Sequence, residues 1–373
     1  MPSASRKSKP GAIRPQQFKS ALQIVSIGGG TGLSTLLTGL KQYSRDAHGE
    51  AHKQPEVDIT AVVTVSDDGG SSGRLRRDFD ILPPGDIRNC MTALSEDEHL
   101  LSQLFRHRFA SGRGLKGHSF GNLFLTALHQ ITGDFAQAVK LSSEILAIRG
   151  RIFPATSANV SLEAVLTDGS LVRGESKISK SRSPIRRVRL HPRNCEPLEE
   201  TLEAIALADL ITIGPGSLYT SVIPNLLVKG LADAIYQSRA LKVYFGNLMW
   251  QPGETVNFSA SQHVEAIHAH ARCKLLDCVV VNTAPIPLNL QTRYAHEHVK
   301  PVENDFTQLT KMGVKVVTAP LIGEMAAQQE KIRHDPTALA EVVIDLASRS
   351  RSLQVKRHVF NEHRKQEERR PVQ

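Results

Sequence analysis

The stretch QIVSIGGGTGLSTLLTGL, residues 23–40, decides the fold. Residues 23–27 form a short apolar run rich in β-branched side chains, which is typical of a buried strand. A run of glycines follows, and leucines then recur at helical spacing up to Leu40. Glycines let the backbone approach an anion closely, and the start of a helix points free N–H groups at it. We therefore predict that this turn cradles phosphate through Gly29, Gly30, Thr31 and Gly32.

The spacing Gly30-x-Gly32-x-x-Thr35 matches the dinucleotide-binding fingerprint only in part, because Thr35 stands where the third glycine would be. Such a partial match, taken alone, also fits a tight turn between a strand and a helix that binds no ligand. Later segments favour a ligand, because other predicted strands also end in glycine-rich or polar loops.

The net charge of +9 over 373 residues lies mainly at the two ends of the chain. Residues 1–20 carry five Lys or Arg and no acid, and residues 349–373 carry eight basic and three acidic residues, which leaves about −1 for the rest. Both ends are rich in polar residues and are predicted to be disordered. A third basic run, residues 173–193, contains no aromatic residues for base stacking, so it predicts a solvated face and nucleic-acid binding is not expected.

The four cysteines form no Cys-x-x-Cys pair, which argues against a zinc ribbon or a thioredoxin-type site. Scattered cysteines in a chain of this length fit a reducing cytosol. The N-terminal residues lack the apolar core of a signal peptide, and no apolar run reaches the roughly 20 residues that span a bilayer. We expect a cytoplasmic protein without a membrane span.

A second buried strand, residues 58–65, runs into a polar loop over residues 66–74. Acids at this position contact the ribose in dinucleotide folds. Such a loop can grip sugar hydroxyls, accept phosphate on its N–H groups or hold Mg²⁺ through an aspartate, and a surface turn without a ligand is the alternative. The candidate ligand contacts are Asp67, Asp68, Gly69, Ser71 and Ser72.

Two more loops carry polar residues directly before predicted helices. In LPPGDIRN (82–89), Asp86 is a candidate magnesium ligand together with Asp68, or simply a helix cap, and Arg88 and Asn89 are candidate ligand contacts. In GHSFGN (117–122), His118 and Asn122 are candidate polar contacts, although a lone histidine is more often structural.

The strand at residues 209–213 ends in Gly-Pro-Gly-Ser, a second turn of the phosphate-binding type. Ligands of open α/β sheets bind beyond the carboxyl ends of the strands near a switch point, so the two glycine turns are expected to face one crevice. Its further candidate contacts are Gly214, Gly216 and Ser217, with Asn247 after the strand at 241–245 and Arg333 before a helix capped by Asp335.

Strands alternate with helices along the chain, which predicts a Rossmann-like α/β fold with a mostly parallel, doubly wound sheet. We expect one domain over residues 21–348, with a small β-rich excursion at about 151–190 and a basic tail on either side. The Asp168-Gly169 pair predicts a hairpin within the excursion.

Six motifs, in this order, resemble the bacterial gluconeogenesis factor family, which is related to 2-phospho-L-lactate transferase. They are IGGGTG (27–32), TVSDDGGSSGRLR (64–76), PPGDIRN (83–89), GHSFGNL (117–123), GPGSLYTSVIPNLL (214–227) and QPGET (251–255). The resemblance implies a Rossmann-like fold that binds a UDP-sugar such as UDP-GlcNAc, with dinucleotides also considered. It further implies a link between gluconeogenic growth, peptidoglycan precursor supply and cell shape, and a protein partner in that metabolism.

Three readings of the site follow. The first is a nucleotide-sugar sensor without catalysis, because the sequence shows no nucleophile elbow and no histidine cluster of the metal-binding type. The second is a Mg²⁺-dependent transferase of the phospholactyl type, and the third is a protein that binds NAD(P). We expect a homodimer, and Trp250, which stands where the family usually has a smaller polar residue, is expected to narrow the ligand pocket.

Overall fold

The computed structural model describes residues 21–46, 49–96, 100–323 and 331–368. Its centre is a sheet of seven strands, in which every pair of neighbours is parallel. The strand order is β10 (Lys315–Ala319), β9 (Cys278–Asn282), β8 (Leu241–Phe245), β7 (Leu210–Ile213), β1 (Leu22–Gly28), β2 (Val57–Val63) and β3 (Arg151–Pro154). The prediction of a mostly parallel, doubly wound α/β sheet is confirmed.

The sheet has its switch point between β1 and β7. From β1 the chain builds β2 and β3 on one side, and it later returns to pair β7 with the other edge of β1. Connections therefore leave β1 and β7 in opposite directions, which opens a crevice at their carboxyl ends. All seven residues of β1 are buried, which explains the apolar run that the sequence shows there.

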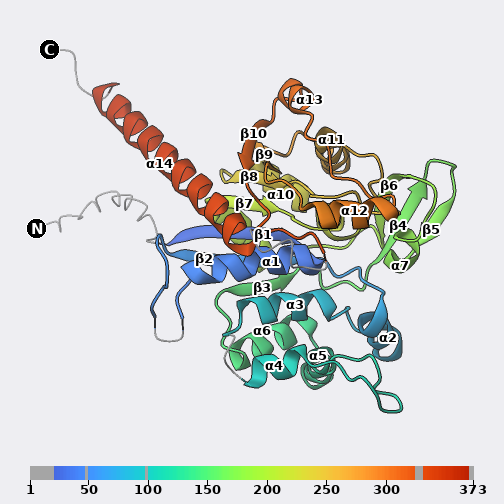
Figure 1. Cartoon of the computed structure of the whole chain (residues 1–373). Helices are drawn as coiled ribbons and strands as arrows, with labels where there is room; N and C mark the ends of the chain where they lie inside the picture. The colour runs from blue at the N-terminus through green and yellow to red at the C-terminus, as the bar shows by residue number, and fades with distance from the viewer. Residues whose placement is uncertain (1–20, 47–48, 97–99, 324–330, 369–373) are drawn as a thin grey trace, which may run out of the picture.

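Helices cover the sheet, and α1 packs against both α3 and α14 (Figure 1). The helices are α1 (Gly30–Leu40), α2 (Gly70–Phe79), α3 (Gly85–Leu94), α4 (Leu100–Arg106), α5 (Phe120–Thr132), α6 (Phe135–Ile145), α7 (Glu175–Ile178), α8 (Glu199–Leu207), α9 (Ile223–Leu226), α10 (Leu231–Gln237), α11 (Ala260–Ala271), α12 (Leu288–His296), α13 (Phe306–Lys311) and α14 (Pro336–Glu368). A 3₁₀ turn, η1 (Lys41–Tyr43), extends α1, and a π-helical turn, η2 (Leu218–Val222), precedes α9.

The β-rich excursion is smaller than the sequence suggests. The strand predicted at its start is β3, which belongs to the main sheet. The excursion proper is an antiparallel sheet of β5 (Leu171–Arg173), β4 (Ser161–Leu166) and β6 (Ile185–His191), and the predicted hairpin joins β4 to β5. The basic run is partly neutralised there, because the buried carboxylate of Glu163 pairs with Arg173 and Arg189 across the strands. Arg186 and Arg187 are exposed, as a solvated face requires.

The helix at the end of the chain is longer than expected. The prediction of a disordered tail from residue 349 is wrong for residues 349–368, which continue α14. Residues 337–368 contain neither proline nor glycine, so nothing in the backbone stops the helix, and Arg351 fastens it to the sheet by an ion pair with Asp209. The predicted tail at residues 1–20 and the last residues, 369–373, lie outside the described residues.

Candidate functional site

The two predicted phosphate-binding turns lie against each other at the carboxyl ends of β1 and β7. A Cβ atom built on Gly32 would stand 2.4 Å from the carbonyl oxygen of Pro215 and 2.8 Å from Cα of Gly216. Only glycine therefore allows this approach of one turn to the other. The expectation that both turns face one crevice is consistent with this contact.

A crevice of about 260 Å³ opens over these turns. The β1–α1 turn, the β7–η2 turn, the loop after β8 and the segment before α14 form its walls. Its lining residues are Gly29, Gly30, Thr31, Gly32, Thr35, Pro215, Gly216, Ser217, Ser221, Asn247, Leu248, Met249, Trp250, Gln251, Tyr294, Ile332, Arg333 and His334. Of the predicted contacts, the structure thus brings together Gly29–Gly32, Gly216, Ser217, Asn247 and Arg333, and Gly214 lies directly behind them at the end of β7.

The β1–α1 turn presents backbone donors to the crevice. Gly30 has a φ of +62°, a left-handed conformation that glycine adopts without strain. Gly29 caps α1 without any side-chain hydrogen bond, and the Gly30 N–H donates to the carboxylate of Asp86. The N–H groups that this 11-residue helix offers to a ligand are therefore those that follow Gly30 in its first turn. Such an end favours an anion through its free donors and through the helix dipole.

Amide side chains fix the shape of the opposite wall. The Nδ2 of Asn247 donates to the Gly216 carbonyl at 3.1 Å, and the Nε2 of Gln251 donates to the Ser217 hydroxyl at 2.8 Å. Tyr244 donates its buried hydroxyl to Oδ1 of Asn247 at 2.8 Å. Both amides therefore hold the glycine turn after β7 in place.

Glu254 holds the backbone that follows the second turn. Its carboxylate accepts hydrogen bonds from the Tyr219 N–H and from the Thr220 hydroxyl, both at 3.0 Å, at the start of η2. Burial raises the pKa of Glu254, and these hydrogen bonds oppose that rise. The QPGET motif predicts no role for Gln251 or Glu254 from the sequence alone, because their partners lie more than 30 residues away along the chain.

Arg333 is exposed on the rim and is the one Lys or Arg among the described lining residues. The neighbouring side chain, His334, carries no charge. Burial lowers the pKa of His334 to about 4, so the ring is neutral, and its Nε2 lies 3.2 Å from the Gly246 carbonyl oxygen. A carbonyl only accepts, so His334 donates its hydrogen there, and the cation available to an anion is Arg333.

Trp250 lines the crevice as well. Its Nε1 donates to the Phe258 carbonyl at 3.1 Å, and the ammonium group of Lys300 lies 5.7 Å from its ring centre. These contacts hold the indole in the wall of the crevice, and the narrowing of the ligand pocket by Trp250 stays a prediction.

Asp86 braces the β1–α1 turn from behind. Its Oδ2 lies 2.8 Å from the position of a Cβ on Gly29, and its carboxylate accepts a hydrogen bond from the Gly30 N–H. Burial and the nearby charge of Asp67 raise the pKa of Asp86 to about 6. The alternative that Asp86 caps its helix is wrong, because Asp86 lies in the first turn of α3 and Pro84 occupies the N-cap.

The two acids after β2 point to different places. Asp67 accepts from the Gly69 N–H at 2.7 Å, and burial raises its pKa. Asp68 reaches the excursion, where it accepts from the Ser176 N–H at 2.8 Å near the start of α7. Glu175 of α7 faces both of them and Asp86, and burial among these carboxylates raises the pKa of Glu175 to about 9.

The predicted magnesium ligands do not form a preformed metal site. In the part of the chain that the structure describes, no three or more His, Cys, Asp or Glu side chains are grouped so that they could hold a metal ion. Asp68 and Asp86 each already accept a backbone N–H from a different element. A metal here would need further oxygen ligands from a bound phosphate.

The remaining predicted contacts form a separate polar group beyond Asp86, outside the crevice lining. Ser71 lies 3.0 Å from Nδ1 of His118, and Arg88 donates to Asn89 and to the Ser119 hydroxyl. Ser71 and Ser72 are buried in the first turn of α2, where the sequence had indicated a loop. Asn122 is also buried, within α5.

Comparisons with known proteins agree with this architecture. Residues 24–322 match the family model described as 2-phospho-L-lactate transferase CofD. The chain is 46% identical over 329 residues to the gluconeogenesis factor of Halalkalibacterium halodurans, covering 88% of this chain and 98% of that protein. It is 47% identical over 324 residues to the gluconeogenesis factor of Bacillus subtilis, again covering 98% of that protein.

A crystal structure of a Bacillus halodurans protein superposes with a TM-score of 0.81 at 46% identity, over 87% of this chain and 99% of that one. None of the described helices combines the length and apolar character needed to cross a bilayer. The matched length, the identity and the shared fold together establish that this chain belongs to the gluconeogenesis factor family, within the wider CofD family.

Proposed function

We propose that this protein binds a nucleotide sugar of the UDP-GlcNAc type in the crevice and acts as a cytoplasmic regulatory protein. In this role it would link central carbon metabolism and gluconeogenic growth to cell-wall precursor supply and cell shape. The observation that carries the proposal is the convergence of two glycine turns, the start of α1 and the Arg333 guanidinium on one crevice. This combination suits the diphosphate of such a ligand.

The crevice offers binding groups without an evident catalytic pair. Among its described lining residues, no hydroxyl is hydrogen-bonded to a histidine, a lysine or a carboxylate. The Ser217 hydroxyl accepts from Gln251, and the Thr35 hydroxyl donates to the Thr31 carbonyl. This arrangement favours a sensor over an enzyme that needs an activated nucleophile.

Calorimetric titration with UDP-GlcNAc tests the proposal. We expect binding without turnover, and a loss of about tenfold or more in affinity in Arg333→Gln, because one charge-assisted contact to phosphate is worth roughly 1.5–3 kcal/mol. Arg349→Gln, on the exposed part of α14, is the matched control and should bind as the wild type does. Absence of UDP-GlcNAc binding together with clear binding of NAD(P) would overturn the proposal.

A second candidate is a Mg²⁺-dependent transferase, and the buried carboxylates behind the glycine turn favour it. Asp67 and Asp86 are the acids that could share an ion with ligand phosphates beside Gly30. Its test is product formation that depends on added Mg²⁺ and falls in Asp86→Asn. We also expect a homodimer and a protein partner in precursor metabolism, which sedimentation and co-purification would detect.

A further inference from the structure

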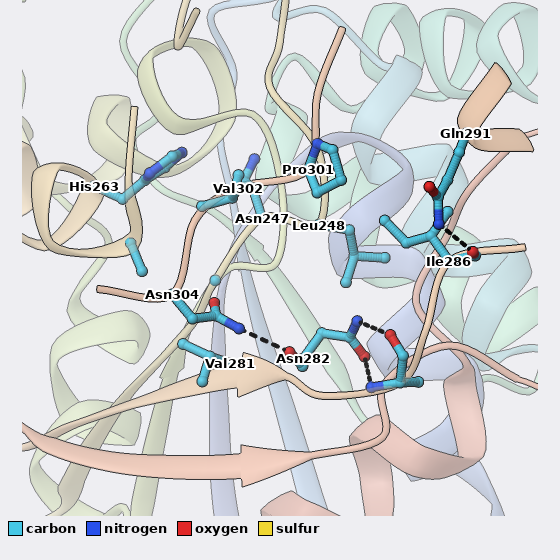
Figure 2. A pocket seen from close by; sticks show the side chains of 13 residues that line it. Asn247, Leu248, His263, Val281, Asn282, Ile286, Gln291, Pro301, Val302 and Asn304 are labelled. Atoms are coloured by element: carbon cyan, nitrogen blue, oxygen red, sulfur yellow. Dashed lines mark hydrogen bonds between the residues drawn. The ribbon is translucent and has the colours of Figure 1, made fainter. Parts of the chain in front are cut away.

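A second cavity of about 240 Å³ adjoins the crevice (Figure 2). The two share Asn247 and Leu248, so the cavity continues the crevice along the carboxyl ends of β8 and β9. Neither reaches the roughly 300 Å³ at the lower end of common ligand pockets, but together they exceed it. The cavity is lined by Gly246, Asn247, Leu248, Ala260, His263, Val281, Asn282, Ala284, Ile286, Gln291, Pro301, Val302 and Asn304.

One buried acceptor in this lining has no partner. His263 is 1% exposed, and its Nε2 makes no hydrogen bond to any described residue. Its Nδ1 lies 2.8 Å from the Ser259 carbonyl oxygen. Because a carbonyl only accepts, Nδ1 must carry the ring hydrogen, so Nε2 of the neutral ring presents a bare lone pair. A buried acceptor without a donor costs roughly 1–3 kcal/mol, which a ligand N–H would recover.

The ring cannot easily turn to another partner. His263 stacks on Tyr244 with 6.5 Å between ring centres and meets Phe258 edge-on at 5.6 Å. Burial lowers the pKa of His263 to about 4, so the ring stays neutral at physiological pH. Figure 2 shows the side chain projecting from α11 toward Asn247, one of the two residues that line both the cavity and the crevice.

The other polar groups of the cavity already have structural roles. Asn282 donates to the Ala284 carbonyl and accepts from the Leu321 N–H, and Asn304 donates to the Asn282 carbonyl. Asp305 fixes the neighbouring backbone by accepting from the Ser261 N–H at 2.9 Å. Between these polar groups, the aliphatic side chains of Leu248, Val281 and Ile286 also line the cavity and can contact the flat faces of a heterocycle.

We infer that this cavity is the nucleobase subsite of the ligand bound in the crevice, and that Nε2 of His263 accepts the ring N–H of a lactam-type base such as uracil. The inference rests on the proposed function, because it takes the crevice as the phosphate site. Uracil carries a hydrogen on N3, whereas the corresponding ring nitrogens of cytosine and adenine are unprotonated acceptors. The subsite would therefore select uridine over cytidine and adenosine nucleotides.

The test compares UDP, N3-methyl-UDP, CDP and inorganic pyrophosphate by calorimetry on the full chain. We expect UDP to bind about tenfold or more tightly than N3-methyl-UDP and CDP, because a site built for a donor rejects analogues that lack it. In His263→Phe this preference should shrink to within about twofold, while pyrophosphate binds as before. His268→Phe, on the same helix but outside the cavity lining, is the matched control and should keep the preference.

The outcomes separate the two proposals. Equal binding of UDP and N3-methyl-UDP by the wild type overturns the base subsite even if His263→Phe fails to fold, and so does an unchanged preference in a folded His263→Phe. If pyrophosphate binds in either case, the proposal that the crevice binds phosphate is still supported. If neither UDP nor pyrophosphate binds, the nucleotide-sugar function and the subsite both fall.

Discussion

Glu175 shows how strongly one side chain depends on its surroundings. It comes from the small antiparallel excursion, yet it faces Asp67, Asp68 and Asp86 of the main domain and Glu254 of the loop after β8. Its pKa rises from 4.5 to about 9, first through burial and then through these carboxylates. At neutral pH Glu175 is therefore a protonated acid that can donate a hydrogen bond within the group.

This protonation makes a prediction about stability. Because the folded pKa lies above the unfolded value, the contribution of Glu175 is fully present below about pH 4.5 and is lost as pH rises through about 9. Glu175→Gln should therefore gain stability over the wild type as pH increases, by on the order of a few kcal/mol at pH 8. Melting temperatures measured from pH 5 to pH 9 test this.

The exposed Glu203→Gln on α8 serves as the control for Glu175 and should show no such trend with pH. A constant difference between Glu175→Gln and the wild type across this range would contradict the prediction.

Gly28 ends β1 and Gly32 lies in the first turn of α1, and a methyl group added to each would meet different surroundings. A Cβ on Gly32 would stand 2.4 Å from the Pro215 carbonyl, whereas one on Gly28 finds its nearest neighbour at 3.5 Å. We predict that Gly32→Ala costs about 1–3 kcal/mol of stability and most of the nucleotide-sugar affinity, because it forces the two turns apart. Gly28→Ala should cost less than about 1 kcal/mol and retain binding. Urea unfolding and calorimetry measure both, and equal effects would show that the contact between the turns is unimportant.

At the scale of the elements, local patterns predicted the strands and turns well. The residues 23–40 gave β1 and α1 because apolar runs, glycines and helical spacing are all local signals. Glu175, Glu254 and His263 were missed for a common reason. Their roles depend on partners from other elements, and sequence spacing carries no record of such contacts. Two further predictions failed because contacts between distant elements leave no local signal. The sequence placed β3 in the small excursion instead of the main sheet, and it ended the last helix before residue 349, although α14 continues beyond it.

The part of α14 from residue 349 on, which the sequence predicts as a disordered tail, is held to the sheet by a nearly buried ion pair. Arg351 donates to Asp209 at 3.0 and 2.5 Å and to the Ala21 carbonyl at 2.7 Å, and Asp209 also accepts from the Gln23 N–H at 2.7 Å. We predict that Arg351→Ala costs about 3–5 kcal/mol, because it leaves the carboxylate of Asp209 buried without its cation. Denaturant unfolding measures the loss.

Arg349→Ala is the control for this element. Its exposed pair with Asp345 one turn away on the same helix should contribute about 0.3–0.5 kcal/mol at most. Similar losses for Arg349→Ala and Arg351→Ala would mean that α14 is not anchored through Asp209.

For the whole molecule, α14 extends from its contacts with α1 away from the sheet (Figure 1). We predict that a chain of residues 21–354 keeps the stability and the UDP-GlcNAc affinity of the full protein, because it retains Arg351 and Gln354, which donates to the Arg239 carbonyl at 3.0 Å. Any salt-dependent binding of nucleic acid by the basic tails should be lost in this shortened chain. A chain that ends at residue 348 should be less stable, and unchanged unfolding of that chain would contradict the anchoring role of Arg351.

The strand order also bears on synthesis by the ribosome. β1 is the first strand to be made, and it pairs with β2 soon afterwards, but its other neighbour, β7, begins at Leu210. At about 5–20 residues per second, the edge of β1 that faces β7 stays unpaired for roughly 10–40 s. An apolar strand with an open edge readily pairs with other chains. The central position of β1 thus leaves the nascent chain with an open strand edge until β7 is made, and the phosphate-binding crevice between the two strands can form only after that.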